Sequence, residues 1–198
     1  MSSYRPVNPK FNPQALRFIA IDTGTHGAIC GCSLVTGKIT LHKLDGQDPE
    51  ELLPVLDNAL GDINLLDCVV VEQPPYFMGT IIPSARIAVL FESFGIIVGY
   101  LMARGVKVVR VTPKVWQERL HDIIGKRGNM KHGDWKKVLT EYAKGKYEGI
   151  DNLIGQTSDS LLIAEWWMNE GYYTYSNEKK PIKKKPSKKG KNKTESSL

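Results

Sequence analysis

Apolar residues in the first quarter of the chain fall into short runs separated by turn-forming residues. The first run covers residues 17–22 and closes on a carboxylate, and nearby glycines allow a tight bend before a second run at residues 28–35. Thr36-Gly37 then permits a hairpin into a third extended segment at residues 38–42. The pattern predicts a meander of three strands.

Beyond this meander, helical apolar spacing alternates with continuous apolar runs. Residues 67–72 place Cys-Val-Val-Val before a closing glutamate, as expected of a central buried strand. Residues 83–103 form a long helix whose apolar arc is wider than one sheet can cover, so we expect it to be deeply buried or to form a homodimer interface. The other expected elements are a strand at 107–111 and helices at 49–60, at 113–120, at 157–169 and in the segment that starts at 134. The helix at 157–169 is expected to be amphipathic, with Thr157 and Ser158 as candidate caps. This order predicts an α/β domain in which helices flank a mixed five-stranded sheet.

Length and charge favour one domain with appendages. The chain has 198 residues and 41% hydrophobic residues, enough for one ordinary core. Residues 1–16 contain three prolines and are expected to form an irregular lead-in. We expect residues 17–176 to form the domain and residues 177–198 to form a disordered lysine-rich tail. Nine lysines and two glutamates give this tail a net charge of +7, while the whole chain carries +6. The tail is therefore either a solubilising segment or a non-specific phosphate-binding arm.

The three cysteines, Cys30, Cys32 and Cys68, lie in predicted strands, and an odd number is a poor disulfide framework. We interpret them as core residues of a protein from a reducing cytoplasm. No signal segment is evident at the N-terminus. The most apolar stretch, residues 94–103, is shorter than the roughly 20 residues that cross a bilayer, so no membrane association is expected.

Three carboxylates occupy positions that this element order can bring together. Asp22 ends the first strand, Glu72 ends a central strand, and Asp159 begins the last helix. Any one of them alone could simply end a strand or cap a helix. A buried acid at the end of an apolar strand nevertheless costs free energy unless it is compensated, and hard oxygen ligands suit Mg²⁺. The three acids together favour a metal site for phosphodiester hydrolysis.

The sequence around these acids resembles the motifs of RuvC-type Holliday-junction resolvases, phage-encoded members above all. Residues 18–25 are similar to the first-strand Asp-x-Gly-[Ser/Thr] motif, residues 69–73 to the strand ending in Glu-Gln, and residues 157–164 to the last motif, an Asp before an apolar helix. The resemblance covers about residues 17–167. It implies a ribonuclease H-like fold and a homodimer that nicks opposing strands of a four-way DNA junction in the bacterial cytoplasm. It also implies Mg²⁺ bound by Asp22, Glu72 and Asp159, with Mn²⁺ as an expected substitute.

One position departs from the family pattern. Many members carry a further Asp three residues before the last one, where this sequence has Gln156. Asp151 or a water would then be the fourth ligand, or the ligand is missing. Family members also use a lysine near the last acids to orient phosphate or water. Lys131 is the first candidate for this catalytic role, and Lys136 and Lys137 are the next.

A basic segment at residues 126–146 precedes the last helix. We expect Lys126, Arg127, Lys136 and Lys137 to bind nucleic acid, although a solvated charged face gives the same pattern. An aromatic pair, Tyr76-Phe77, follows the strand that ends at Glu72. The pair could stack on bases at a junction centre or pack in the core. None of the four histidines has metal-ligand spacing.

Three other functions compete with the resolvase interpretation. Residues 21–25 also resemble the first phosphate loop of actin-like ATPases, but the chain lacks the length for two such domains and a second glycine-rich loop. A nuclease for another branched DNA or an RNA shares the fold and metal site, and the sequence does not distinguish it. A nucleic-acid-binding protein without catalytic metal is the third alternative, motivated by Gln156.

Overall fold

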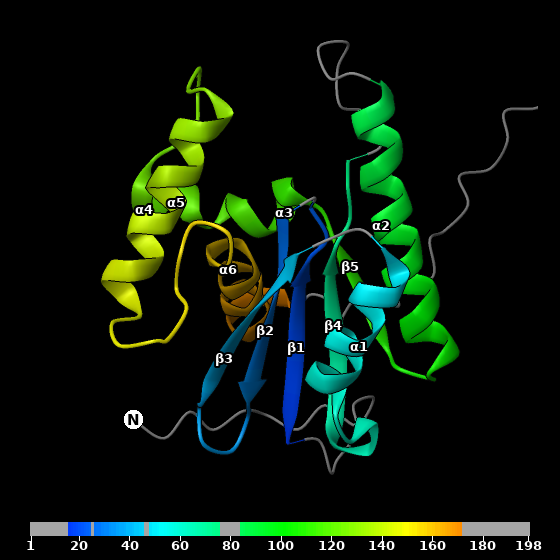
Figure 1. The fold of residues 1–198 in the computed structure, drawn as a ribbon. Coiled ribbons are helices and arrows are strands. Elements are labelled where there is room, and N and C mark those ends of the chain that lie inside the picture. Colours follow the sequence, from blue (N-terminus) through cyan, green and yellow to red (C-terminus); the bar gives the residue numbers. More distant parts are fainter. Residues whose placement is uncertain (1–15, 25, 46–47, 76–83, 172–198) are drawn as a thin grey trace, which may run out of the picture.

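The computed structural model describes residues 16–24, 26–45, 48–75 and 84–171 (Figure 1). The lysine-rich tail predicted at 177–198, the aromatic pair Tyr76-Phe77 and, apart from Leu16, the predicted lead-in all lie outside these residues.

Five strands form one sheet in the order β3-β2-β1-β4-β5. Their bounds are β1 Arg17–Asp22, β2 His26–Ser33, β3 Ile39–Asp45, β4 Leu66–Glu72 and β5 Val108–Val111. β2 is antiparallel to both its neighbours, whereas β1, β4 and β5 are mutually parallel. This strand order, with only β2 reversed, is that of a ribonuclease H-like domain and confirms the predicted mixed five-stranded sheet.

The register of the parallel strands places their carboxyl ends at one edge of the sheet. Ile21 on β1 pairs with Val71 on β4, so the next residues, Asp22 and Glu72, end neighbouring strands at the same level. Glu72 in turn pairs with Val111 at the end of β5. Parallel pairing therefore brings together two acids that are far apart in the sequence.

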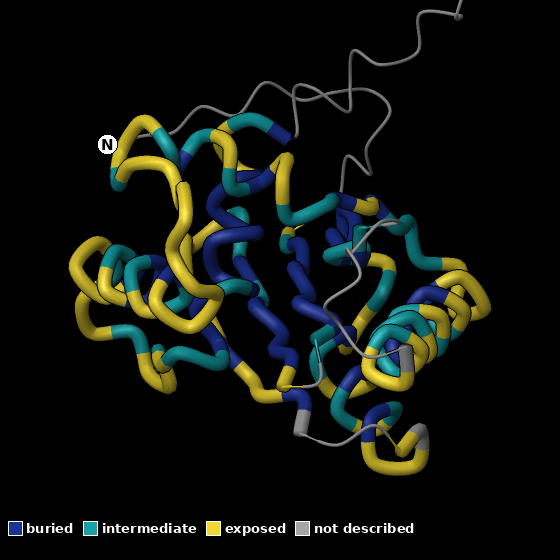
Figure 2. The backbone as a smooth tube through the Cα atoms, turned by 90° about the horizontal axis from the view of Figure 1, so that it is seen from above, coloured by how far each residue is buried: buried dark blue, intermediate teal, exposed yellow. Residues whose placement is uncertain are grey.

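Side chains alternate across the sheet and supply two separate cores. Phe18 and Ala20 of β1 belong to one buried cluster, while Ile19 and Ile21 belong to the other. Figure 2 shows the buried strands between helices on both sides. The helices are α1 Pro49–Leu60, α2 Ser84–Ala103, α3 Pro113–Glu118, α4 Leu120–Ile124, α5 His132–Lys146 and α6 Ser158–Trp166, with short turns at Ile63–Leu65 and Trp167–Gly171.

Helix α6 differs from the prediction. An amphipathic helix was expected, but every residue of α6 except Asp159 is buried. The helix contacts β1 and β2 on one side and α5 on another, so almost no face meets solvent. Its expected side-chain cap is also absent, because the Thr157 hydroxyl donates to the Asn152 carbonyl at 2.6 Å.

The three cysteines are buried and carry free thiols, as the core interpretation expects. Sγ of Cys30 lies 3.7 Å from Sγ of Cys32, because residues two apart on β2 face the same side of the sheet. Burial and the neighbouring Cys32 raise the pKa of the Cys30 thiol, and the Cys32 hydrogen bond is the largest contribution. The Cys30 thiol is therefore kept protonated within the core.

Helix α2 is the one described helix that is long and apolar enough to cross a membrane by length and composition. The length argument from residues 94–103 was therefore wrong, because the helix continues back to Ser84. Its second half packs against the sheet, where Ile97, Val98 and Leu101 are buried. Its first half leaves much apolar surface uncovered within the described part of the chain.

Candidate active site at the carboxyl edge of the sheet

Asp22 is held in place by the tight bend after β1. Its residue is 8% exposed, and its Oδ1 accepts a hydrogen bond from the Gly24 N–H at 2.9 Å. A side chain at Gly27 would collide with the Asp22 carbonyl oxygen and lie 2.9 Å from the Gly24 carbonyl oxygen. The bend therefore requires a glycine at position 27 for steric reasons.

Glu72 ends β4 beside Asp22. The hydroxyl of Thr23 donates to the Glu72 carbonyl oxygen at 3.0 Å, which ties the end of β1 to the end of β4. Burial raises the pKa of the Glu72 carboxyl well above its usual value, and the negative charges of Asp22 and Asp159 raise it further. The charges of Asp22 and Asp159 thus make ionisation of Glu72 less favourable.

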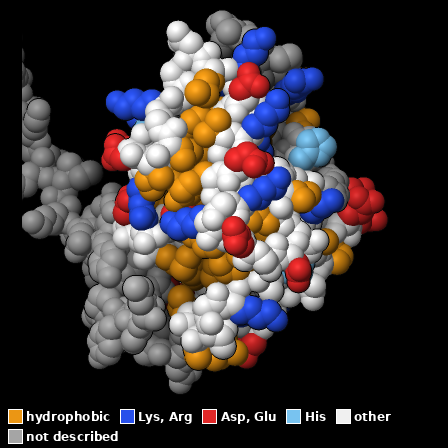
Figure 3. All heavy atoms as spheres, turned by 90° about the vertical axis from the view of Figure 1, so that its left-hand side faces the viewer, with side chains coloured by type: hydrophobic (Ala, Val, Ile, Leu, Met, Phe, Trp, Pro, Cys, Tyr) orange, Lys and Arg blue, Asp and Glu red, His pale blue; other side chains and the backbone are white. Residues whose placement is uncertain are grey.

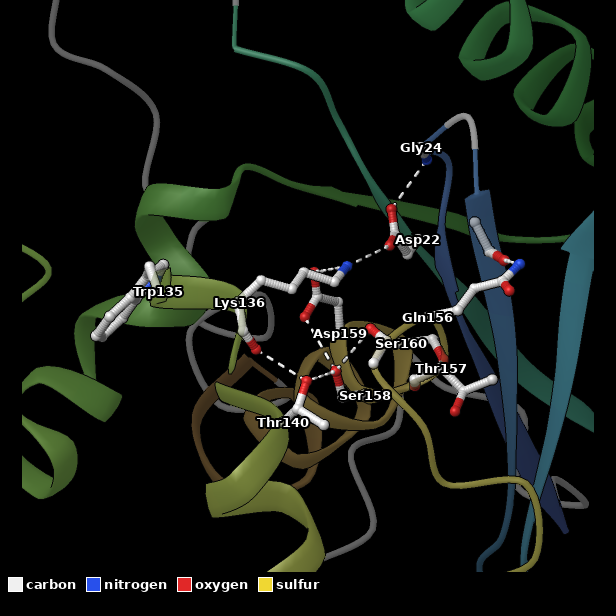
Figure 4. Close-up of polar contacts among 12 residues, drawn as sticks. Asp22, Gly24, Trp135, Lys136, Thr140, Gln156, Thr157, Ser158, Asp159 and Ser160 are labelled. Atoms are coloured by element: carbon white, nitrogen blue, oxygen red, sulfur yellow. Dashed lines mark hydrogen bonds and ion pairs between the residues drawn. The ribbon is translucent and has the colours of Figure 1, made fainter. Parts of the chain in front are cut away.

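Asp159 approaches the strand ends from the first turn of α6, where the positive end of the helix dipole favours a carboxylate. Lys136 approaches from α5. Its Nζ donates to Asp159 Oδ2 at 2.7 Å and lies 3.9 Å from Asp22 Oδ2 (Figure 4). The ammonium group therefore lies between two of the three predicted acids.

The balance of charge at the site favours a cation. Burial, followed by repulsion from Asp159, raises the pKa of Asp22 to about 6, although Lys136 and the Gly24 N–H lower it. Burial lowers the pKa of Lys136, but the attraction of Asp159 and Asp22 outweighs burial and the pKa is raised. One ammonium group faces three carboxylates, and it does not restore the pKa of Asp22 or Glu72 to its usual value.

The donor set fits a hard divalent cation in its chemistry. Neighbouring carboxylates contribute to the raised pKa values of Asp22 and Glu72, and an ion that prefers oxygen ligands would relieve this repulsion. Among the described residues, however, no group of three His, Cys, Asp or Glu side chains converges closely enough to hold a metal ion. In this arrangement Lys136 supplies the positive charge, and metal binding would require the ammonium group to withdraw from Asp22 and Asp159.

The three lysines named from the sequence lie in different environments. Lys136 contacts the acids, whereas Lys131 is exposed at the start of α5 and Lys137 is exposed and 3.6 Å from Asp134. A helical projection could have favoured Lys136, because it adjoins the buried face that includes Trp135 and residues 139, 140 and 143. Lys131 precedes the helix and has no place on that face.

Gln156 and Asp151, the two positions considered for a fourth ligand, lie in different surroundings. The Gln156 side chain donates from Nε2 to the Gly27 carbonyl oxygen at 3.3 Å, which links the segment before α6 to the bend after β1. Asp151 is exposed in the preceding turn. Gln156 thus supports the bend that positions Asp22, and among the described residues Asp151 belongs to no group of three His, Cys, Asp or Glu side chains that could hold a metal ion.

The basic residues that were expected to bind nucleic acid lie on α5 and in the turn between α4 and α5. Lys126 and Arg127 are exposed in the turn between these helices, where the Arg127 Nε–H donates to the Met130 carbonyl oxygen at 3.3 Å. Figure 3 shows Lys and Arg side chains spaced along the face that contains α4 and α5 and interspersed with acids. Lys137 adds an exposed charge on α5, while Lys136 is directed into the site.

Comparison with known proteins gives structural similarity alone. No protein-family model and no curated protein matches this sequence. T. thermophilus RuvC in complex with a Holliday junction substrate is similar in structure at 15% identity and a TM-score of 0.48, over 78% of this chain and 96% of that one. The yeast mitochondrial Holliday junction resolvase Ydc2 has 15% identity and a TM-score of 0.47, over 83% and 84%. The fowlpox virus resolvase with its Holliday junction DNA has 17% identity and a TM-score of 0.34, over 77% and 97%. By the order and direction of its own five strands, the chain is a ribonuclease H-like domain.

Proposed function

We propose that this chain is a metal-dependent endonuclease that resolves four-way DNA junctions. The observation that supports this most is the meeting of Asp22, Glu72 and Asp159 at one edge of the sheet, with the ammonium of Lys136 between Asp22 and Asp159. Mutually destabilised acids beside a positioned lysine are typical of a catalytic site. The motif resemblance to RuvC-type resolvases supplies the expected substrate.

Asp22, Glu72 and Asp159 would hold Mg²⁺, or Mn²⁺ in its place, and the metal would supply water activation and neutralise charge on the leaving oxygen. Lys136 would then donate to a non-bridging phosphate oxygen, because the metal would compete with it for Asp159. The Gly24 N–H fixes Asp22 Oδ1 and leaves Oδ2 directed toward the site. Burial of Asp22 limits competing solvent contacts and strengthens each charge interaction.

Paired nicks require two active sites, and we propose that α2 forms the interface of a homodimer. Ile87, Leu90 and Phe91 in its first half are only partly buried, and Met102 near its end is 60% exposed. An apolar surface of this kind is typical of subunit contacts. A second copy of the chain covering α2 would present two identical sites to the opposing strands of one junction.

The exposed charges of Lys126, Arg127 and Lys137 would bind DNA phosphates beside the site, and Tyr76 and Phe77 would stack on bases at the junction centre. Phosphate contacts position a duplex without reading its sequence. Junction preference would then arise from the spacing of the two sites in the dimer. The lysine-rich tail would add salt-dependent affinity.

The decisive experiment is cleavage of an end-labelled four-way junction beside a linear duplex of the same sequence. Wild type, Asp22→Asn and Asp57→Asn are compared with Mg²⁺ and with chelator. Asp57 is a matched control because it is a partly exposed acid on α1 that pairs with Arg104 at 2.8 Å. We expect paired nicks in the junction only, dependent on Mg²⁺, lost in Asp22→Asn and retained in Asp57→Asn. Cleavage by Asp22→Asn at the wild-type rate would exclude the proposed site.

One observation favours a second function, junction binding without cleavage. Lys136 already pairs with Asp159, and no three acids among the described residues lie close enough together to hold a metal ion. Titration of Mg²⁺ into the protein separates the two functions, because a bound metal raises the melting temperature. Junction binding without a melting shift or cleavage would support the non-catalytic function.

A further inference from the structure

Two buried hydroxyl groups connect the helices that carry Lys136 and Asp159. Oγ1 of Thr140 on α5 lies 3.1 Å from Oγ of Ser158 at the start of α6. Ser158 is fully buried and Thr140 is 6% exposed. Figure 4 shows this pair directly beside the ion pair of Lys136 and Asp159. Each hydroxyl belongs to the same helix as one member of the ion pair.

The further contacts of the hydroxyls reach both members of that ion pair. Thr140 Oγ1 lies 2.8 Å from the carbonyl oxygen of Lys136, one helical turn earlier. Ser158 Oγ lies 3.1 Å from the Gly155 carbonyl oxygen and 3.5 Å from Asp159 Oδ1. Asp159 Oδ2, its other oxygen, is the one that accepts from Lys136.

The two hydroxyls have only two hydrogens to donate, and each hydroxyl also accepts. If Ser158 donates to Thr140, Thr140 donates to the Lys136 carbonyl. If Thr140 donates to Ser158, Ser158 donates to Gly155 or to Asp159 Oδ1. Both arrangements satisfy the buried hydroxyls, and the second provides Asp159 with a donor when its oxygens lose another partner.

We propose that Thr140 and Ser158 are positioning residues that set the orientation of the Asp159 carboxylate relative to Lys136. In the first arrangement the pair ties the start of α6 to the turn of α5 that carries Lys136, and in the second Ser158 donates to Asp159 when a substrate or cation draws Lys136 away. An aliphatic pair would fill the same space without the desolvation cost of two hydroxyls. The consequence for catalysis rests on the proposed nuclease function, whereas the orientation of the ion pair does not.

Ser160 provides a matched control on the same helix. It is fully buried like Ser158, but its hydroxyl donates to the Thr157 carbonyl oxygen at 2.9 Å, within its own helix turn. Ser160→Ala and Ser158→Ala therefore delete the same atom at the same burial. Only Ser158→Ala removes a contact between α5 and α6 at the site.

The experiment compares wild type with four variants by two measurements. The variants are Ser158→Ala, Thr140→Val, Thr140→Ser and Ser160→Ala. The first measurement is kcat and KM for junction cleavage with Mg²⁺. The second is the NMR signal of the Lys136 ammonium group in metal-free protein, which reports how firmly Asp159 holds it. We expect Ser158→Ala and Thr140→Val to lower kcat about tenfold at unchanged KM, and to shift or broaden the ammonium signal. Ser160→Ala should retain both readouts, and Thr140→Ser should restore them.

The outcomes separate this inference from the proposed function. If wild type cleaves junctions but Ser158→Ala matches Ser160→Ala in kcat and in the ammonium signal, the positioning role is refuted and the nuclease function stands. If wild type does not cleave, a signal that changes in Ser158→Ala and Thr140→Val alone supports the positioning role without catalysis. An unchanged signal in those two variants would overturn it in that case as well.

Discussion

Replacing Asp22 by asparagine should inactivate the protein and also stabilise it. The wild-type carboxyl is buried, and burial together with the charge of Asp159 raises its pKa from 3.8 to about 6. The folded state therefore binds a proton between pH 4 and 6 that the unfolded state has released. The stability of the wild type falls as pH rises through this window.

The size of this effect follows from the pKa difference. A rise from 3.8 to about 6 corresponds to a loss of about 3 kcal/mol of folding free energy above pH 6. Asp22→Asn has no charge at this position, and its side-chain oxygen can still accept from the Gly24 N–H. We therefore expect the variant to exceed the wild type by about 3 kcal/mol at pH 8, or roughly 6–12 °C in melting temperature, and to match it near pH 4. Removal of the Asp22 charge also lowers the pKa of Glu72, which acts in the same direction.

Urea denaturation in chelator at pH 4, 6 and 8 measures this directly, with Asp57→Asn as the control. Asp57 is about half-exposed and paired with Arg104, so its replacement should change stability by less than about 0.5 kcal/mol at each pH. Adding Mg²⁺ should narrow the gap at pH 8, because the metal would stabilise only the protein that retains Asp22. Parallel pH profiles for wild type and Asp22→Asn, or a variant that is less stable at pH 8, would refute the reasoning.

Three further predictions concern the surroundings of the site. Lys136→Met should abolish cleavage of the four-way junction, whereas Lys131→Met should lower kcat by less than about tenfold. Equal losses of kcat in the two variants would refute the catalytic role of Lys136. Gly27→Ala should destabilise by about 1–3 kcal/mol in urea, because its new methyl group would collide with the bend after β1; a stability equal to wild type would refute that steric argument. Lys146→Met should lower the free energy of unfolding in urea by about 2 kcal/mol, because Glu165, whose side chain is 3% exposed, loses its ion-pair partner at 2.7 Å. Adding Glu165→Gln should restore part of this stability. If the double variant recovers none, the loss is not due to a buried charge.

The sequence was sufficient to predict the two strands, β1 and β4, that end in Asp22 and Glu72. Alternation in β1 separates Phe18 and Ala20 from Ile19 and Ile21, and the apolar run in β4 stops at Glu72. These are local properties, because strand periodicity and burial preference act over a few residues. Helix α6 shows the limit of such patterns: an amphipathic helix was predicted, yet Ser158 and Ser160 are buried together with every other residue of the helix except Asp159. The Ser160 hydroxyl donates to the Thr157 carbonyl oxygen and the Ser158 hydroxyl contacts Thr140 on α5, and no periodicity reveals such pairing.

The sequence pattern also did not predict which lysine contacts the acids. Lys131, Lys136 and Lys137 lie within one short basic segment, and each has the same chemistry. Lys136 lies next to Asp159 because of how α5 packs against α6, with Trp135 buried and Thr140 in contact with Ser158. A one-residue change of position turns a helical side chain by about 100°, so small differences in sequence separate a site residue from a solvated one.

The sequence by itself determined which segments become strands and helices and that Asp22 and Glu72 end apolar strands, because hydrophobic periodicity and local conformational preference are encoded residue by residue. The tertiary structure alone decided that these strand ends are adjacent, that Asp159 and Lys136 meet there, and that Gln156 bonds to the Gly27 carbonyl oxygen in the bend after β1. Those relations depend on parallel pairing across β1 and β4 and on the packing of α5 against α6. Such contacts join residues distant in the chain, and their geometry is set by the shape of the whole core and not by any local pattern.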